Sequence, residues 1–200
     1  MTPAEKNSYT FTIDSCHLHA LVSGDREGKP VLLLHGMKFN ADTWHELGTL
    51  KQLADGGYHG VALEMPGFGQ SSPCGLDEEL VLQRYITGTG LRRPVLVGPS
   101  MGGRIALEFA IAHPDLISGL VLIGAVGVEE NRERLAAIRV PTLILWGSQD
   151  QISSPENADL LHEAISGSRK KIFADSPHPC YLDKPDDWHR ELLAFLPTCR

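Results

Sequence analysis

The chain has 200 residues, of which 42% are hydrophobic and 22% charged, and its formal net charge at pH 7 is −7. This composition is typical of a globular domain and argues against a disordered or fibrous protein. The longest basic run is Arg169-Lys170-Lys171, which we expect to form a solvated strand edge. Because the chain is acidic and has no longer basic run, we expect no nucleic-acid partner. No apolar stretch approaches the roughly 20 residues that span a bilayer, and residues 1–9 lack the pattern of a signal peptide. The sequence therefore predicts a cytoplasmic protein with no membrane partner, and it leaves the oligomeric state open.

The four cysteines point to the same compartment. Cys16, Cys74, Cys180 and Cys199 are widely spaced and include no CxxC pair. This spacing favours free thiols in a reducing compartment over a disulfide framework or a zinc site. Cys180 follows His178 by two residues, and a packed thiol is favoured there over a reactive one.

Strand and helix signals alternate along the chain and predict one α/β domain over residues 1–200. Residues 9–13 and 17–22 predict an antiparallel pair, and residues 31–34 form a continuous apolar run typical of a central parallel strand. A capping box of Thr43 and Glu46 predicts a helix that ends before Gly56. Further strands are predicted at residues 60–63, 95–97, 120–123, 142–146 and 171–174, and further helices at residues 77–87, 104–113, 131–138, 155–165 and 185–195.

The segment Gly98-Pro99-Ser100-Met101-Gly102 has the pattern of a nucleophile elbow. It stands between an apolar strand and an amphipathic helix, which is the context that this turn requires. The two glycines avoid collisions across a sharp turn, and the following helix directs its amide dipoles toward a reacting oxygen. We therefore expect Ser100 to be a nucleophile rather than a structural serine in a turn.

An acid and a base follow the elbow in the order that such a serine needs. Asp150 follows the strand at residues 142–146, and His178 follows the strand at residues 171–174. Because the carboxyl ends of parallel strands meet at one edge of the sheet, both can converge on Ser100. His178 is then the general base, and Asp150 orients its ring. The alternative for Asp150 is a helix N-cap, and for His178 a structural histidine.

The same carboxyl edge of the sheet is predicted to carry hydrogen-bond donors for an oxyanion and side chains that contact the substrate. The backbone N–H groups of Met37 and Met101 are predicted to form the oxyanion hole. Phe39, Phe68 and Tyr181 are candidate substrate-binding residues, since each lies close in sequence to one of these motifs.

The remaining histidines have structural interpretations. His17 and His19 share one strand face, and without a third ligand nearby they are expected to be solvated rather than to bind a metal. His35 is expected to anchor the loop that carries Met37. No metal or organic cofactor is predicted, because a proton relay and two amides supply the catalysis.

These motifs together resemble the serine α/β hydrolases. The resemblance rests on His35-Gly36, on Pro66-Gly67-Phe68-Gly69-Gln70-Ser71, on the elbow and on the turns of Asp150 and His178, in the order that the superfamily uses. The segment from His178 to Pro185, with Trp188-His189 after it, further resembles the α/β-hydrolase-domain-containing 14 subgroup. Its members are small, lack a lid and are associated with hydrolysis of short acyl esters and with acyl transfer from acetylated lysine to coenzyme A. The chain departs from the animal members in its complete GxSxG, and Glu64 stands where many superfamily members carry Asp.

The resemblance implies an α/β-hydrolase fold, with a mostly parallel sheet flanked by helices. Only residues 128–141 are available for a cap, so we expect an open site that prefers short-chain or activated acyl esters. The leading function is a carboxylic-ester hydrolase with an acyl-Ser100 intermediate. Acyl transfer to coenzyme A or another acceptor is the first alternative, and a non-catalytic receptor or interaction module the second. Dehalogenases and epoxide hydrolases of this fold carry Asp at the position of Ser100 and are set aside.

Overall fold

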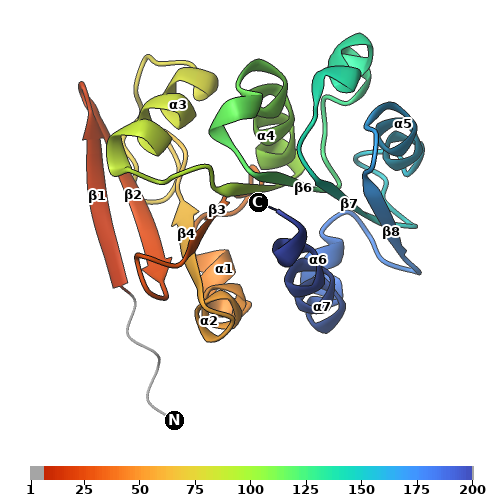
Figure 1. Ribbon diagram of the computed structural model, residues 1–200, viewed down its shortest axis with the longest axis horizontal. Helices are drawn as coiled ribbons and strands as arrows, with labels where there is room; N and C mark the ends of the chain where they lie inside the picture. Colours follow the sequence, from red (N-terminus) through yellow and green to blue (C-terminus); the bar gives the residue numbers. More distant parts are fainter. Residues whose placement is uncertain (1–6, 200) are drawn as a thin grey trace.

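A computed structural model of the protein describes residues 7–199. Eight strands form one sheet in the order β1-β2-β4-β3-β5-β6-β7-β8 (Figure 1). The pairs β1–β2 and β2–β4 are antiparallel, and the other neighbours are parallel. The strands are β1 Asn7–Ile13, β2 Cys16–Ser23, β3 Lys29–Leu33, β4 Tyr58–Leu63, β5 Val95–Pro99, β6 Gly119–Ile123, β7 Thr142–Gly147 and β8 Arg169–Phe173. The sequence predicts no signal peptide at residues 1–9, and most of these residues lie outside the described part of the chain.

The central strands are buried on both faces, as their apolar runs predicted. Every residue of β5, β6 and β7 is buried, and Val31, Leu32 and Leu33 of β3 are fully so. Alternate residues of each strand enter two separate cores, one on each side of the sheet. At the sheet edge, residues 169–171 of β8 are exposed, which confirms the prediction of a solvated strand edge.

Helices cover both faces of the sheet. The helices α3, α4 and α5 pack on one face, and α1, α2, α6 and α7 on the other (Figure 1). They span α1 Asp42–Glu46, α2 Thr49–Asp55, α3 Glu78–Thr89, α4 Ser100–Ala112, α5 Glu156–Ala164, α6 Cys180–Asp183 and α7 Pro185–Phe195. Three short 3₁₀ helices complete the described elements, at Pro114–Leu116, Glu129–Ala137 and Leu196–Thr198. None of the helices within residues 7–199 is long and apolar enough to cross a membrane.

The helix predicted to begin at Thr43 is interrupted. Gly48 adopts a left-handed conformation, with φ of 82°, and separates α1 from α2. The N-cap of α1 is Ala41, which makes no side-chain capping bond, so the predicted capping box of Thr43 and Glu46 is wrong. Trp44 of α1 is buried in the core, where its indole N–H donates to the carbonyl of Leu34 at 2.9 Å.

The connection between β6 and β7 carries no cap domain. Its only helix is the 3₁₀ helix Glu129–Ala137, which places Asn131 and Leu135 in the interior. This agrees with the expected lidless fold.

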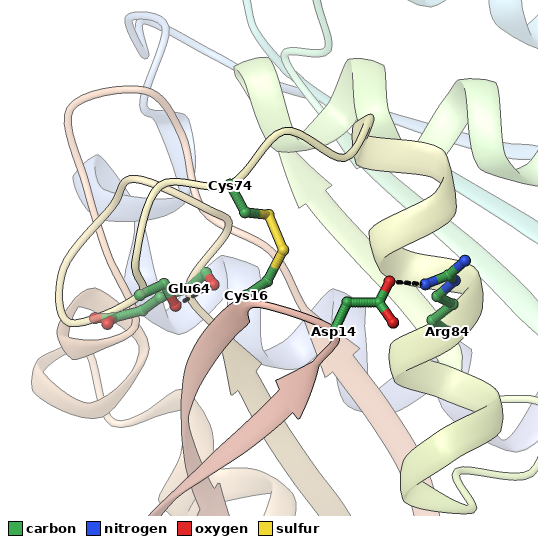
Figure 2. The surroundings of a disulfide bond; sticks show 6 residues. Asp14, Cys16, Glu64, Cys74 and Arg84 are labelled. Carbon is green, nitrogen blue, oxygen red and sulfur yellow. Dashed lines mark hydrogen bonds and ion pairs between the residues drawn. A yellow bond between two sulfur atoms is a disulfide. The ribbon is translucent and has the colours of Figure 1, made fainter.

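The prediction that all four cysteines are free thiols is wrong for two of them. A disulfide joins Cys16, at the start of β2, to Cys74, in the loop before α3 (Figure 2). Beside it, Arg84 of α3 forms an ion pair with Asp14 in the β1–β2 turn. The spacing of the cysteines does not reveal the bond, because the two residues meet only when β2 and the loop before α3 have folded together. Disulfides persist mainly in oxidising compartments, so the expected cytoplasmic location loses its support from the cysteines.

Cys180 and Cys199 are free and buried. Burial, with the nearby negative charge of Asp150, raises the pKa of the Cys180 thiol to about 12. The preference for a packed rather than a reactive Cys180 is confirmed.

Candidate active site

Ser100 occupies a strained turn between β5 and α4. Its φ of 52° is positive, which is uncommon for a residue with a side chain. A Cβ atom at Gly98 would lie 2.1 Å from the carbonyl oxygen of Gly102, and one at Gly102 would lie 2.6 Å from that of His35. Both flanking glycines are therefore required for the turn to close, as the elbow pattern predicted.

Asp150 and His178 form a hydrogen-bonded pair in which the carboxylate is buried and the imidazole is partly exposed. The Nδ1 atom of His178 lies 2.7 Å from Oδ2 of Asp150, whose side chain is fully buried. The other carboxylate oxygen accepts the backbone N–H groups of Ile152 and Ser153, each at 2.9 Å. Asp150 therefore fixes its own turn while it orients the imidazole. The alternative of a helix N-cap is wrong, because the N-cap of α5 is Pro155 and Asp150 binds only the turn before it. The Nε2 atom of His178 is buried and has no hydrogen-bond partner among the described residues.

Sequence reasoning missed Gly124, which follows β6 directly. A Cβ atom there would lie 3.0 Å from Oδ2 of Asp150 and 3.2 Å from Nδ1 of His178. Its φ of 52° also favours glycine. A residue larger than glycine would disturb the pair of Asp150 and His178. The sequence signal that could have revealed this role was a glycine directly after a predicted strand.

Ser100 and His178 line a common pocket of about 420 Å³. Phe39 and Tyr181, two of the candidate substrate-binding residues, line it as well. The third, Phe68, is not part of the lining, because its ring packs against that of His35 with centroids 4.8 Å apart.

The two predicted oxyanion residues also line this pocket. Met101 is the second residue of α4, where backbone N–H groups have no partner within the helix. The Met37 side chain is 68% exposed at the rim, and Ile152, across the pocket, is 69% exposed. An oxyanion hole formed by the two backbone amides stays a prediction.

The comparisons with known proteins agree with this geometry. The family model of the alpha/beta hydrolase fold matches residues 29–133 and 127–185. Rat ABHD14B, which its name provisionally calls a protein-lysine deacylase, is 37% identical over 174 residues, covering 83% of this chain and 82% of the rat protein. The chain belongs to the α/β-hydrolase family, in its ABHD14 subgroup.

Two further relatives support this. Human ABHD14A is 38% identical over 172 residues, and the match covers 83% of this chain and 63% of that protein. The crystal structure of a protein from Thermoplasma acidophilum, described as a predicted CIB-like hydrolase, has a TM-score of 0.90 and 26% identity, covering 96% of this chain and 98% of the other. This α/β hydrolase thus has relatives described as hydrolases and deacylases.

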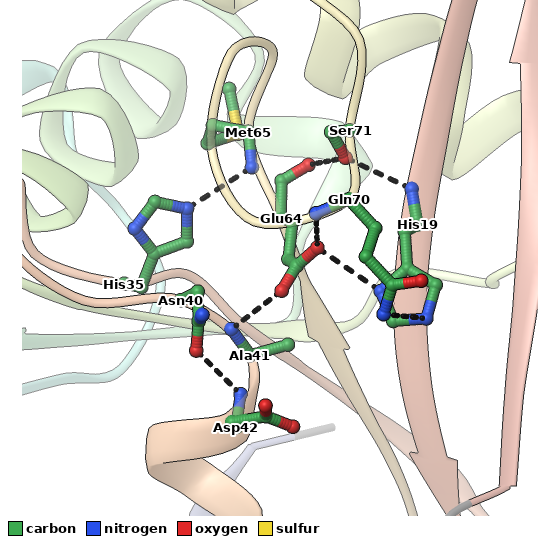
Figure 3. A network of polar contacts seen from close by, with 9 residues as sticks. All are labelled: His19, His35, Asn40, Ala41, Asp42, Glu64, Met65, Gln70 and Ser71. Atoms are coloured by element: carbon green, nitrogen blue, oxygen red, sulfur yellow. Dashed lines mark hydrogen bonds and ion pairs between the residues drawn. The ribbon is translucent and has the colours of Figure 1, made fainter.

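The loop that carries Met37 in this α/β hydrolase is held at both ends by consecutive residues after β4 (Figure 3). At its start, Nε2 of His35 accepts the backbone N–H of Met65 at 3.1 Å. At its end, the backbone N–H of Ala41 donates to Oε1 of Glu64 at 3.3 Å. Burial lowers the pKa of His35, which keeps Nε2 free to accept. The expectation that His35 anchors this loop is confirmed.

Glu64 is the centre of a buried network that the sequence did not reveal. Its Oε2 atom lies 3.1 Å from Nδ1 of His19 and accepts the backbone N–H of Gln70 at 2.6 Å. A Cβ atom at Gly69 would lie 2.2 Å from the carboxylate, so glycine is required for Gln70 to reach it. The expected solvation of His19 is wrong, because the residue is only 7% exposed, whereas His17 is exposed. β2 is an internal strand that packs beside β4, which its sequence alone does not show.

Proposed function

We propose that this protein is a serine hydrolase that cleaves short-chain or activated carboxylic esters through an acyl-Ser100 intermediate. The observation that carries the proposal is the position of His178. It holds a hydrogen bond to buried Asp150 on one ring nitrogen, and its other nitrogen is unpartnered at the pocket that Ser100 also lines.

The reaction follows from this arrangement. The Oγ atom of Ser100 attacks the ester carbonyl while its proton passes to Nε2 of His178. The proton then moves to the departing alcohol, leaving the acyl group on Ser100. Water then attacks the acyl-enzyme as Nε2 of His178 takes its proton, and His178 returns that proton to Oγ of Ser100 as the carboxylic acid leaves. Asp150 holds the ring and stabilises its cation, and the amides of Met37 and Met101 receive the developing oxyanion.

Acyl transfer is the second candidate. It is favoured by the similarity to rat ABHD14B, whose name provisionally refers to protein-lysine deacylation. The acyl-Ser100 intermediate would be the same, but the acyl group would come from a lysine amide and would pass to a thiol such as coenzyme A instead of water. A non-catalytic receptor is disfavoured, because a strained serine beside an oriented acid–base pair has no evident use in binding alone.

Turnover of p-nitrophenyl acetate, butyrate and octanoate by wild type and Ser100→Ala tests the proposal. Ser154→Ala is the matched control, since Ser154 is an exposed serine just beyond the Asp150 turn. Wild type and the control should turn over the short esters and form an acyl adduct in intact-protein mass spectra. Ser100→Ala should lose roughly 10⁶-fold in kcat and form no adduct. Strong acceleration by coenzyme A would favour acyl transfer, and an inert, unlabelled wild type would refute catalysis.

A further inference from the structure

A second and larger cavity lies at the opposite edge of the sheet from Ser100. Its volume is about 980 Å³, and we call it the amino-edge cavity. It is lined by the starts of the parallel strands, at Lys29 in β3 and His59 in β4, and by residues of the loops at 24–28 and 88–92. The Ser100 pocket lies at the carboxyl ends of β3, β5 and β6. The two sites can therefore be occupied independently.

The mouth of the amino-edge cavity carries an excess of positive charge. Arg26, Lys29 and Arg92 line it together with a single carboxylate, Glu27. None of the three cations forms an ion pair with a described residue. Arg26 lies 3.5 Å from the carbonyl oxygen of Thr89, and Lys29 donates to a backbone carbonyl near the C-terminal end. In a chain with a net charge of −7, a cavity whose described lining carries three cations and one carboxylate is suited to an anion.

The same lining contains an apolar wall, which is formed by Tyr9, Phe11, Val22 and Leu91. The ring of Phe11 packs edge-on against that of Tyr85, with centroids 5.6 Å apart. A site with an apolar wall and a few polar groups at its mouth is typical of pockets that bind small organic molecules.

One polar atom of the lining has no partner. Nδ1 of His59 is buried and makes no hydrogen bond to any described residue. Because this atom is closed off from solvent, a ligand oxygen would reach it only after a small movement of the lining.

We propose that the amino-edge cavity binds a small organic anion with an apolar body, of the class of medium-chain carboxylates. The apolar chain lies against the aromatic wall, and the carboxylate faces Arg26 and Arg92. Inorganic phosphate alone would leave the apolar wall unfilled, and an uncharged chain would leave the cations unpaired. The proposal does not depend on the activity of Ser100.

Titration of ¹⁵N-labelled protein with octanoate tests this inference, because amide shifts report where a ligand binds. Glycine amides line both sites and resonate in an uncrowded part of the spectrum. Saturable shifts are expected for the glycines of the amino-edge cavity, at Gly24, Gly28, Gly88 and Gly90. Shifts confined to Gly36 would place octanoate in the Ser100 pocket alone and would overturn the proposal.

Two further ligands test the contributions of the charge and of the apolar chain separately. Octanol has the same chain without the charge, and inorganic phosphate has charge without the chain. Both should bind at least about tenfold more weakly than octanoate at the cavity glycines, which is about 1.4 kcal/mol. Equal binding by octanol would refute the role of the cations, and equal binding by phosphate would refute the role of the wall.

Charge reversal completes the test. Arg26→Glu with Arg92→Glu should weaken octanoate binding at the cavity glycines at least about tenfold, because both cations are exposed at the mouth. Lys171→Glu, on the exposed edge strand β8, is the matched control and should bind as wild type does. If the double variant does not fold, Arg92→Gln alone should still weaken binding. Unchanged affinity in a folded variant would overturn the assignment.

Discussion

Reduction of the disulfide between Cys16 and Cys74 should destabilise the folded protein. The two residues are 58 positions apart in the sequence. Closing a loop of that length in the unfolded chain removes roughly 14 cal/mol/K of entropy, which corresponds to about 4 kcal/mol at 25 °C. For a chain of this size, each kcal/mol shifts the melting temperature by about 2–4 °C, so loss of the bond predicts a fall of about 8–16 °C.

Thermal melting followed by circular dichroism, with and without tris(2-carboxyethyl)phosphine, measures this effect. The reductant should lower the melting temperature of the wild type to that of Cys16→Ser with Cys74→Ser. That double variant is the control and should not respond to reductant, since Cys180 and Cys199 form no disulfide. Iodoacetamide labelling of the unfolded protein shows whether reduction was complete. A shift below about 2 °C after complete reduction would refute the loop-entropy argument.

Four other changes test the candidate site. Asp150→Asn should lower kcat by about 10³- to 10⁴-fold in ester assays, because the amide cannot hold the imidazole of His178 in the productive tautomer; an unchanged kcat would contradict the role of the carboxylate. Glu64→Gln should lower the free energy of unfolding in urea by about 1–3 kcal/mol, because it disrupts a buried hydrogen-bond network. The variant should also lower kcat more than it raises KM. A variant as stable as wild type would count against the role of the network. Burial lowers the pKa of His35 below its ordinary value of 6.5. The unfolded chain therefore binds this proton more readily, and stability should fall as the pH drops below about 6.5. Melting at about pH 7.5 and 5.5 should show a smaller difference in His35→Gln than in wild type. Since its pKa is raised to about 12, Cys180 should resist iodoacetamide in the native protein at about pH 8, and labelling within minutes would contradict its burial.

The sequence predicts the parallel strands and the residues at their ends well, because these features depend on short-range patterns. Apolar runs mark the buried parallel strands, and the strand ends carry Ser100, Asp150 and His178 in an order that only a sheet edge can bring together. The pairing of His178 with Asp150 at 2.7 Å follows from that reasoning. Two of the three candidate substrate residues also line the expected pocket, at Phe39 and Tyr181.

Two of the features that the sequence missed depend on contacts between distant segments. The disulfide of Cys16 with Cys74 and the burial of His19 arise because β2 pairs with β4 and lies beneath the loop that follows it. The break at Gly48 depends on a left-handed residue inside an apparently continuous helical pattern. Spacing along the chain does not encode any of these features.

The same loop after β4 connects stability with chemistry. Its first residue, Glu64, holds the end of the Met37 loop at Ala41, while its far end is held to β2 by the disulfide at Cys74. Between them, the backbone N–H of Ser72 donates to the carbonyl of His17 at 2.9 Å. A loop fixed at three places keeps its carboxylate in position without help from a cap domain.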